Sequence, residues 1–312
     1  MARSTTAEVP TRPFGRTGIP VSILALGGWH IGVPKTEREA TRLVHAAIDG
    51  GITFMDNAWD YNEGVSESRM GKALVGRRDK VFLMTKVCVH GRDARTAMKQ
   101  LEDSLRRLKT DYLDLWQIHE VIFDDEPAKY FAPGGAVEAL DRARQQGKVR
   151  FVGFTGHKDP DIHLRMLAHG YPFDSCQMPL NVFDGQFKSF EQRVLPEVLR
   201  QRIAPIGMKP FCGQGDAIKK RVVSAEDALS YAMSLPVVTT ISGIDSMKVL
   251  KQNVEIASRL KPLSRAQMER IRHKVAEAAG DGRFERYKTT AEHDGDEGRA
   301  QHGFPLQDEL AG

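Results

Sequence analysis

Eight short apolar runs, each followed by a segment of helical periodicity, most constrain what this chain can fold into. The runs are continuous rather than alternating, which is typical of parallel strands buried on both faces. Eight such units in about 260 residues match the size of a (β/α)8 TIM barrel, an α/β fold, with a doubly wound sheet as the alternative. The runs span residues 22–28, 52–56, 81–86, 113–119, 149–155, 175–178, 203–209 and 237–243.

The segments between these runs begin with recognisable helix caps. Thr36 and Glu39 form a capping-box pattern ahead of an apolar helical face. Asp159 is a capping carboxylate directly before a first-turn proline, Pro160. Ser224 opens a later helix in a similar way. Such starts predict helices between the strands, as a barrel requires.

Three segments lie outside the strand–helix units, and no shift in composition divides the chain. Residues 10–21 predict a short N-terminal β-hairpin ahead of a barrel at 22–262, and residues 263–280 predict an additional helix. Residues 281–312 carry eight acidic and four basic side chains, and form a C-terminal tail that is either disordered or draped over the barrel mouth. The 312 residues therefore favour a single barrel domain.

Composition narrows the class of protein and its partners. The 45 basic and 41 acidic residues give a net charge of +4, too small to argue for nucleic acid. The N-terminus lacks the apolar core of a signal peptide, and no stretch approaches the roughly 20 apolar residues that cross a membrane. The sequence leaves open whether the protein is a monomer or a homo-oligomer.

The cysteines and histidines suggest neither disulfides nor a metal centre. Cys88, Cys176 and Cys212 are widely spaced, form no CxxC motif and suit a reducing cytoplasm. No HxH or HExxH motif occurs, so no metal site is predicted.

Polar side chains end several of the apolar runs. In a TIM barrel, catalytic groups lie at the C-terminal ends of the strands, on one rim. Asp56 ends the second run, Lys86 the third and His119 the fourth, and Tyr61 follows Asp56 on the next loop. Singly, each is better explained as a cap, a rim side chain or packing. Together, four complementary groups on three adjacent strand ends predict a catalytic constellation.

Several motifs, in order along nearly the whole chain, resemble those of the aldo-keto reductases. They are GRTGIPVSILALGG (15–28), FMDNAWDYNEGVSESRMGKAL (54–74), LMTKV (83–87), WQIHE (116–120), GFTG (153–156) and GIDSMKVLKQN (243–253). The resemblance implies reduction of an aldehyde or ketone carbonyl, or oxidation of the alcohol, by hydride transfer with a nicotinamide cofactor. It implies NADPH, narrowly ahead of NADH, and a small-molecule carbonyl substrate. The implied catalytic tetrad is Asp56, Tyr61, Lys86 and His119.

The chemistry of carbonyl reduction is consistent with this tetrad. A free tyrosine has a pKa of about 10 and exchanges protons poorly at neutral pH. We expect the ammonium of Lys86, held by Asp56, to lower the pKa of Tyr61. Tyr61 would then be the general acid in reduction and the general base in oxidation. His119 would hydrogen-bond or position the substrate oxygen.

The cofactor is placed by the resemblance, because no GxGxxG motif follows a strand. Family members lay an extended cofactor across the barrel top, with its carboxamide near the fifth and sixth strands and its adenosine near residues 243–253. A plain helix start would equally explain that last stretch, and helix starts also bind anions. The implied cofactor-binding residues are Gly28, Trp29, Asp56, Thr155, Gln177, Met208, Lys209, Pro210, Phe211, Gly243, Asp245, Ser246 and Asn253.

Two departures from the family pattern concern the nicotinamide end. Gly156 and His157 stand where an Asn usually follows the strand-five Ser or Thr, so one carboxamide contact is lost or supplied by His157. Met208 replaces an aromatic that commonly stacks under the ring, and it packs less rigidly.

A third departure concerns the 2′-phosphate of NADPH. Gly243 and Val249 replace basic residues that many members use to hold it. Asp245 would repel a phosphate, whereas Lys248 and Lys251 lie close enough in sequence to compensate.

Aromatic residues on the loops are candidate substrate contacts. Trp29, His30 and Trp59 follow the first two runs, and Phe183 follows the sixth. Phe304 of the tail could close the pocket. These side chains suit a moderately apolar aldehyde or ketone.

Two other functions fit parts of the pattern. A Schiff-base aldolase would use Lys86 as its nucleophile, but it needs an amine of lowered pKa, which nearby Asp56 would oppose. A non-catalytic, nucleotide-sensing subunit would need no tetrad, and the intact tetrad argues against it.

Overall fold

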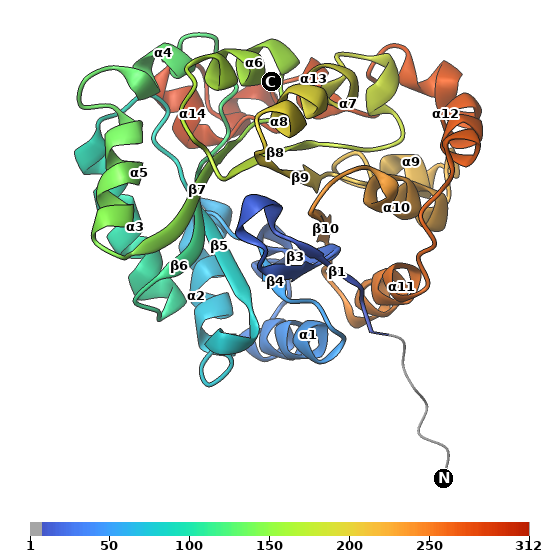
Figure 1. The fold of residues 1–312 in the computed structure, drawn as a ribbon, viewed down its shortest axis with the longest axis horizontal. Coiled ribbons are helices and arrows are strands. Elements are labelled where there is room, and N and C mark those ends of the chain that lie inside the picture. The colour runs from blue at the N-terminus through green and yellow to red at the C-terminus, as the bar shows by residue number, and fades with distance from the viewer. Residues whose placement is uncertain (1–7, 312) are drawn as a thin grey trace.

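The computed structural model describes residues 8–311, and its barrel strands close into a ring. Figure 1 shows this ring surrounded by helices. The closed parallel order, β10-β3-β4-β5-β6-β7-β8-β9, confirms the TIM barrel over the doubly wound sheet. The strands are β3 (Leu24–Gly27), β4 (Phe54–Met55), β5 (Phe82–Val87), β6 (Leu113–Ile118), β7 (Val149–Thr155), β8 (Ser175–Pro179), β9 (Ala204–Met208) and β10 (Thr239–Gly243).

Strand β4 is shorter than the apolar run at 52–56 that predicted it. Its ladder pairs Phe54 and Met55 with β3 and β5. The backbone N–H of Asp56 still donates to the carbonyl of Leu26 (3.0 Å). The chain therefore stays fixed to the barrel up to the first predicted catalytic residue.

Helices follow the strands, and the predicted caps are present. Thr36 and Glu39 make both bonds of a capping box, and Asp159 and Ser224 each accept a bond from a first-turn N–H. The helices are α1 (Glu37–Asp49), α2 (Val65–Ala73), α3 (Ala94–Leu108), α4 (Glu126–Phe131), α5 (Ala136–Gln145), α6 (Pro160–Ala168), α7 (Phe190–Arg193), α8 (Leu195–Arg200), α9 (Asp216–Lys219), α10 (Ala225–Ser234), α11 (Met247–Ser258) and α12 (Arg265–Ala279). Short 3-10 helices are η1 (Gly15–Thr17), η2 (Gly28–Ile31), η3 (Tyr61–Gly64), η4 (Arg78–Lys80) and η5 (Asp184–Gln186).

The predicted N-terminal hairpin closes one end of the barrel. Its strands, β1 (Thr11–Pro13) and β2 (Pro20–Ser22), pair antiparallel and lie in front of the ring in Figure 1. Between them Phe14 is fully buried, with its ring centroid 4.7 Å from that of Phe82 and 5.8 Å from that of Phe151. The hairpin thus plugs the barrel interior with an aromatic side chain, and chemistry is left to the opposite end.

The C-terminal tail packs across that opposite end. Helices α13 (Arg286–Thr289) and α14 (Asp296–Gln301) lie behind the ring in Figure 1, and the 3-10 helix η6 spans Gln307–Ala311. The buried ammonium of Lys288 anchors the tail, lying 2.7 Å from Asp184 and donating to the carbonyl of Phe187 (2.8 Å). The sequence allowed residues 281–312 to be either disordered or packed over the barrel mouth. The described part of the tail is packed over the mouth.

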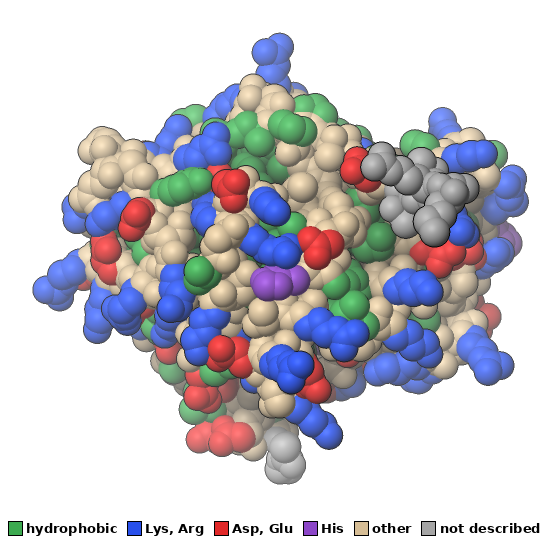
Figure 2. All heavy atoms as spheres, turned by 90° about the horizontal axis from the view of Figure 1, so that it is seen from below, with side chains coloured by type: hydrophobic (Ala, Val, Ile, Leu, Met, Phe, Trp, Pro, Cys, Tyr) green, Lys and Arg blue, Asp and Glu red, His purple; other side chains and the backbone are tan. Residues whose placement is uncertain are grey.

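The helices within residues 8–311 and one face of the surface can be described by length, apolarity and charge. None of the helices described there is both long and apolar enough to cross a membrane. On the face shown in Figure 2, Lys and Arg side chains are scattered among acidic and apolar ones.

Helices α2 and α3 approach each other closely at Gly71, which gives a test of the packing. A Cβ at this position would lie 2.3 Å from the carbonyl oxygen of Arg107. We expect Gly71→Ala to lower the free energy of unfolding by about 1–3 kcal/mol, because backbone must shift to admit the methyl group. Gly280→Ala is the matched control, since its nearest contact would be 3.9 Å away. Urea denaturation checks this, and equal stabilities of the two variants would contradict the packing described.

Candidate active site

The four predicted catalytic residues come from adjacent strand ends on the tail side of the barrel. Asp56 directly follows β4, Lys86 lies in β5, His119 directly follows β6, and Tyr61 begins η3. Strand β5 pairs with both β4 and β6, so the three strand ends are neighbours. The ladder therefore brings together residues that lie 63 positions apart at most.

Lys86 is the centre of this group. Its side chain is fully buried, and its Nζ lies 2.5 Å from Asp56 Oδ1. The ammonium also donates to the carbonyl of Asn57 (2.7 Å) and to the Tyr61 hydroxyl (3.2 Å). One ion pair and two hydrogen bonds therefore surround the ammonium. Asp56, Lys86 and Tyr61 thus form a continuous polar chain that ends at the phenol.

The loop that carries Tyr61 is bent by an unusual run of backbone angles. Asn62, Glu63 and Gly64 have φ of 52°, 56° and 83°, in the left-handed region that side chains seldom adopt. Arg107 of α3 supports the loop by donating to the carbonyl of Trp59 (2.7 Å). The bend returns the chain toward the rim, so the phenol faces Lys86.

The electrostatic setting of Tyr61 differs from the sequence expectation. Burial raises the pKa of the phenol well above its ordinary value, and the carboxylates of Asp56, Asp60 and Glu120 raise it further. The expectation that Lys86 lowers this pKa is therefore wrong. The lysine touches the hydroxyl, but it is paired with Asp56, and more acidic groups surround the phenol than the tetrad includes.

His119 lies against Tyr61 on its other side. The two rings meet edge to face, with centroids 5.4 Å apart. Nδ1 of the imidazole lies 3.1 Å from Asp60 Oδ1. Burial lowers the pKa of His119, and Asp60 opposes that shift. The imidazole is therefore in its neutral form near pH 7.

Glu120 and Asp60 are functional candidates that the sequence reasoning missed. Glu120 is buried, with φ of 54°, and its Oε2 accepts a bond from the backbone N–H of Gly295 in the tail (3.0 Å). Burial raises the pKa of Glu120 well above its ordinary value, as do Asp60 and Asp294. Glu120 directly follows His119 in the sequence and Asp60 directly precedes Tyr61, and this adjacency could have identified both as candidates.

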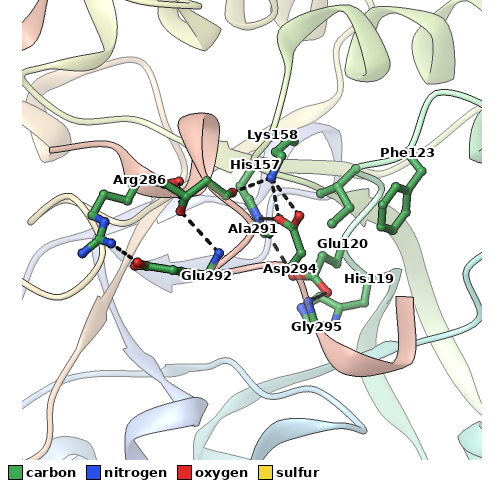
Figure 3. Close-up of polar contacts among 12 residues, drawn as sticks. His119, Glu120, Phe123, His157, Lys158, Arg286, Ala291, Glu292, Asp294 and Gly295 are labelled. Atoms are coloured by element: carbon green, nitrogen blue, oxygen red, sulfur yellow. Dashed lines mark hydrogen bonds and ion pairs between the residues drawn. The ribbon is translucent and has the colours of Figure 1, made fainter. Parts of the chain in front are cut away.

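The tail reaches the mouth through Asp294, as Figure 3 shows. Lys158 holds both oxygens of this carboxylate (2.7 and 2.8 Å). His157 Nε2 lies 3.9 Å from Asp294 and 3.9 Å from Glu120. Burial lowers the pKa of His157 to about 3. His157, the expected substitute for a carboxamide contact, therefore faces the tail.

Thr155 and Gln177 offer a setting that fits the carboxamide of a nicotinamide. They are partners in the β7–β8 register, and both are buried. Gln177 Nε2 faces Met208 Sδ at 3.4 Å, while its Oε1 is buried without a hydrogen-bond partner. An unsatisfied buried acceptor is unfavourable, and the amide N–H of a ligand would satisfy it.

The next loop continues along the rim from Met208. Lys209 has φ of 55°, and its Nζ lies 5.2 Å from the ring centre of Tyr287 in the tail. Burial lowers the pKa of Lys209 to about 8, with Glu120 opposing the shift. Pro210 is buried and Phe211 is half-buried. These residues line a path between the barrel mouth and the tail.

The residues predicted for the adenosine end also serve the fold. Ser246 caps α11 by accepting from the N–H of Val249 (3.4 Å). Asn253 is fully buried and donates to the hydroxyl of Ser242 (3.0 Å). Asp245 is exposed. At Gly243, a Cβ would lie 2.2 Å from the ring of His30, so His30 occupies the space that a side chain there would need.

The predicted substrate contacts fall into two groups. Trp29, at 50% exposure, meets the ring of His30 edge to face, beside Gly28 at the start of η2. Trp59 precedes the Tyr61 loop, and its indole N–H has no hydrogen-bond partner. Phe183 is different, because it is 1% exposed and packs 5.3 Å from Phe284. Phe183 is therefore a packing residue that offers no exposed surface to a substrate.

Phe304 of the tail, expected to close the substrate pocket, packs against an aromatic side chain next to the mouth. It is half exposed, and its ring centroid lies 5.6 Å from that of Phe123, on the loop after His119.

Comparison with known proteins adds the family context. The model of the aldo/keto reductase family matches residues 23–217. Aldo-keto reductase YhdN of Bacillus subtilis is 31% identical over 212 residues, which are 63% of this chain and 60% of that protein. The 6-dehydroglucose reductase of Novosphingobium aromaticivorans is 30% identical over 244 residues, 72% of this chain and 78% of that protein. The match to YhdN therefore spans less than two thirds of that relative.

Solved structures show the same fold. The holo form of aldo-keto reductase AKR11C1 from Bacillus halodurans has a TM-score of 0.71 at 24% identity, covering 89% of this chain and all of that one. An aldo-keto reductase from Klebsiella pneumoniae, in complex with NADPH, has a TM-score of 0.71 at 23% identity, covering 88% and 97%.

The buried histidine at the tail interface predicts a pH dependence of stability. His157 has a pKa of about 3 in the folded protein and about 6.5 when unfolded, so below pH 6.5 the unfolded chain binds the extra proton. Stability is therefore lost as pH falls from about 6.5 toward 3. We expect His157→Gln to reduce this slope by up to about 1.4 kcal/mol per pH unit. Urea denaturation between pH 7 and 4.5 measures it, with exposed His273→Gln as the control. An unchanged slope in His157→Gln would contradict the assignment.

Proposed function

Because this chain belongs to the aldo/keto reductase family, we propose that it is an NAD(P)H-dependent oxidoreductase that reduces an aldehyde or ketone carbonyl. The observation that supports this most is the buried chain from Asp56 through Lys86 to Tyr61, with contacts of 2.5 and 3.2 Å. It ends in a phenol at the C-terminal rim of the barrel, where TIM-barrel chemistry takes place.

Each residue of the tetrad has a distinct task in this proposal. A bound reduced nicotinamide supplies the hydride to the carbonyl carbon. Tyr61 holds the proton on its hydroxyl and passes it to the carbonyl oxygen. Lys86 orients that hydroxyl, and Asp56 keeps the ammonium in place. His119 positions the oxygen beside the phenol.

The environment of Tyr61 favours the reductive direction. A phenol whose pKa is raised stays protonated near pH 7 and is ready to donate. Oxidation would require its deprotonated form, which the carboxylates of Asp56, Asp60 and Glu120 disfavour. We therefore propose carbonyl reduction as the main reaction.

The Schiff-base alternative is opposed by the contacts of Lys86. An aldolase lysine needs a free amine lone pair, but this Nζ makes three polar contacts, one of them with a carboxylate. No contact among the described residues specifically favours the non-catalytic, nucleotide-sensing alternative. The activity assay below distinguishes it from the reductase.

The substrate we propose is a small, moderately apolar aldehyde or ketone. Trp29 lies in η2, directly after β3, and is 50% exposed, and Trp59 lies on the loop between β4 and Tyr61 and is partly exposed, so both offer apolar surface next to strand ends at the rim. The relatives include a 6-dehydroglucose reductase and the methylglyoxal reductase YeaE of Escherichia coli, both named for carbonyl compounds.

The cofactor we propose is NADPH, with NADH as the alternative. Gln177 and Thr155 fit the carboxamide, and the Klebsiella structure is a complex with NADPH. The adenosine end carries opposing charges, because Asp245 is exposed beside Lys248 and Lys251. The three buried free thiols suit a reducing cytoplasm, which we propose as the location.

The acid role of Tyr61 is tested by removing its hydroxyl. We expect Tyr61→Phe and Lys86→Met each to lower kcat by about 10²–10⁴-fold while the cofactor still binds, because proton donation is lost and binding surface is kept. A panel of small aldehydes with NADPH or NADH measures the rate, and fluorescence titration measures binding. Tyr112→Phe, on the surface, is the control.

Three results would overturn this proposal. They are an active Tyr61→Phe variant, a borohydride-trapped substrate adduct on Lys86, and tight cofactor binding by the unmodified protein without any turnover.

The acidic residue at the adenosine end gives a test of cofactor preference. We expect Asp245→Ala to improve NADPH affinity by about 2–5-fold, the effect of removing one exposed repulsive charge. NADH affinity should change less, since NADH lacks the 2′-phosphate. Glu255→Ala, exposed two turns further along α11, is the control. An unchanged or weaker NADPH affinity would remove Asp245 from the cofactor site.

A further inference from the structure

Two nitrogen bases lie at the rim on strand ends that the tetrad does not use. His30 lies in η2 directly after β3, Lys209 directly follows β9, and Gly243 ends β10. Strand β10 pairs with both β3 and β9, so the three strand ends are neighbours. The tetrad lies at the ends of β4, β5 and β6, and the proposed carboxamide contacts lie on β7 and β8. His30 and Lys209 therefore occupy the remaining part of the mouth.

The imidazole of His30 points at the end of β10 with its nitrogen-bearing edge. A Cβ at Gly243 would lie 2.2 Å from Cε1 of the ring, 2.5 Å from Nε2 and 2.7 Å from Nδ1. His30 is partly exposed, and within residues 8–311 neither ring nitrogen has a hydrogen-bond partner. Both nitrogens are therefore available to a ligand at this side of the mouth.

Lys209 supplies a cation close to this imidazole. Its Nζ lies 5.2 Å from the ring centre of Tyr287, but no carboxylate within residues 8–311 lies close enough to form an ion pair with it. A partly buried ammonium in this position has lost hydration without gaining a counter-ion, which is unfavourable. An anionic ligand would supply the counter-ion, as Asp56 does for Lys86.

We infer that His30 and Lys209 bind the diphosphate of the nicotinamide cofactor, an inference that rests on the proposed oxidoreductase function. Phosphate oxygens accept charge-assisted hydrogen bonds from ammonium and imidazolium groups. An apolar aldehyde or ketone would leave Lys209 without a counter-ion, whereas a diphosphate offers negatively charged acceptors to both side chains. The inference moves His30 from the expected substrate contacts to the cofactor.

Two charged side chains within residues 8–311 act on the protonation of His30. Burial lowers the pKa of the ring, Asp245 on the loop before α11 opposes that shift, and Lys209 adds to it. Arg69 of α2, which packs beside η2, donates to the carbonyl of Ile31 (3.1 Å) rather than to the ring. The imidazole is therefore neutral near pH 7. A diphosphate beside the ring would raise its pKa again, so binding takes up a proton from the buffer.

Binding of NADH at several pH values tests this without any assay of catalysis. NADH carries the diphosphate, which stays ionised in this range, and lacks the 2′-phosphate, a monoester that titrates near pH 6. We expect NADH affinity to fall by up to about tenfold per pH unit as pH rises from the lowered pKa of free His30 to its higher value in the complex. Fluorescence titration between pH 5.5 and 7.5 measures this, because Lys209, with a pKa of about 8, stays mostly charged there. Calorimetry in two buffers of different ionisation enthalpy counts the protons taken up.

Variants of His30 separate a phosphate ligand from a packing residue. We expect His30→Gln to raise the Kd of both NADH and NADPH at pH 6.5 by about tenfold or more, and to abolish the proton uptake. His30→Arg, which is always charged, should bind NADH at pH 7.5 at least as tightly as the unmodified protein, also without proton uptake. His45→Gln is the matched control, since His45 is a partly exposed histidine of α1 whose Nε2 faces the carbonyl of Ala73.

The inference would be overturned by an unchanged NADH affinity in His30→Gln, by a loss confined to NADPH, or by proton uptake that persists in this variant. Absence of proton uptake by the unmodified protein would also overturn it, and that measurement does not depend on how well a variant folds. If both cofactors bind and are turned over without any dependence on His30, the inference alone fails. If neither cofactor binds to the unmodified protein, the proposed oxidoreductase function fails with it.

Discussion

The buried ion pair between Lys86 and Asp56 is the interaction on which the rest of the mouth depends. Both side chains are almost fully removed from water, with 0% and 4% exposure. An unpaired buried ammonium would cost several kcal/mol, so the lysine must keep its carboxylate and its other acceptors. The pair fixes the ends of β4 and β5 relative to each other, and the remaining donor of the ammonium fixes the Tyr61 hydroxyl. The geometry of the proposed proton donor therefore follows from the need to neutralise one lysine.

Around this pair, the balance of charge at the mouth is acidic rather than basic. Asp60 and Glu120 lie close enough to raise the pKa of Tyr61, and burial, Asp60 and Asp294 in turn raise the pKa of Glu120. Acidic surroundings favour the protonated form of Tyr61, which is the form that a general acid must have.

The barrel and the tetrad could be predicted from the sequence because both depend on short, contiguous patterns of residues. Continuous apolar runs mark strands, and Asp56, Lys86 and His119 each end or directly follow one. The contacts that were missed are long-range. Glu126 meets His90 across 36 residues, and Glu120 meets Gly295 across 175, with no motif that joins them. The direction of the Tyr61 pKa was also beyond sequence reasoning, since it depends on burial and on the sum of several charges.

The tail fits this mouth closely, and two of its glycines show why. A Cβ at Gly295 would lie 2.6 Å from Glu120 Oε2, and a Cβ at Gly298 would lie 2.7 Å from the ring of His90. At both places the tail backbone touches buried polar groups directly, which a larger residue would prevent. Glu120 neighbours His119, and His90 holds Cys88, so the tail seals the two residues that stand directly behind the chemistry. The hairpin fills one end of the barrel with Phe14, whereas the tail packs its backbone against Glu120 and His90 at the other end.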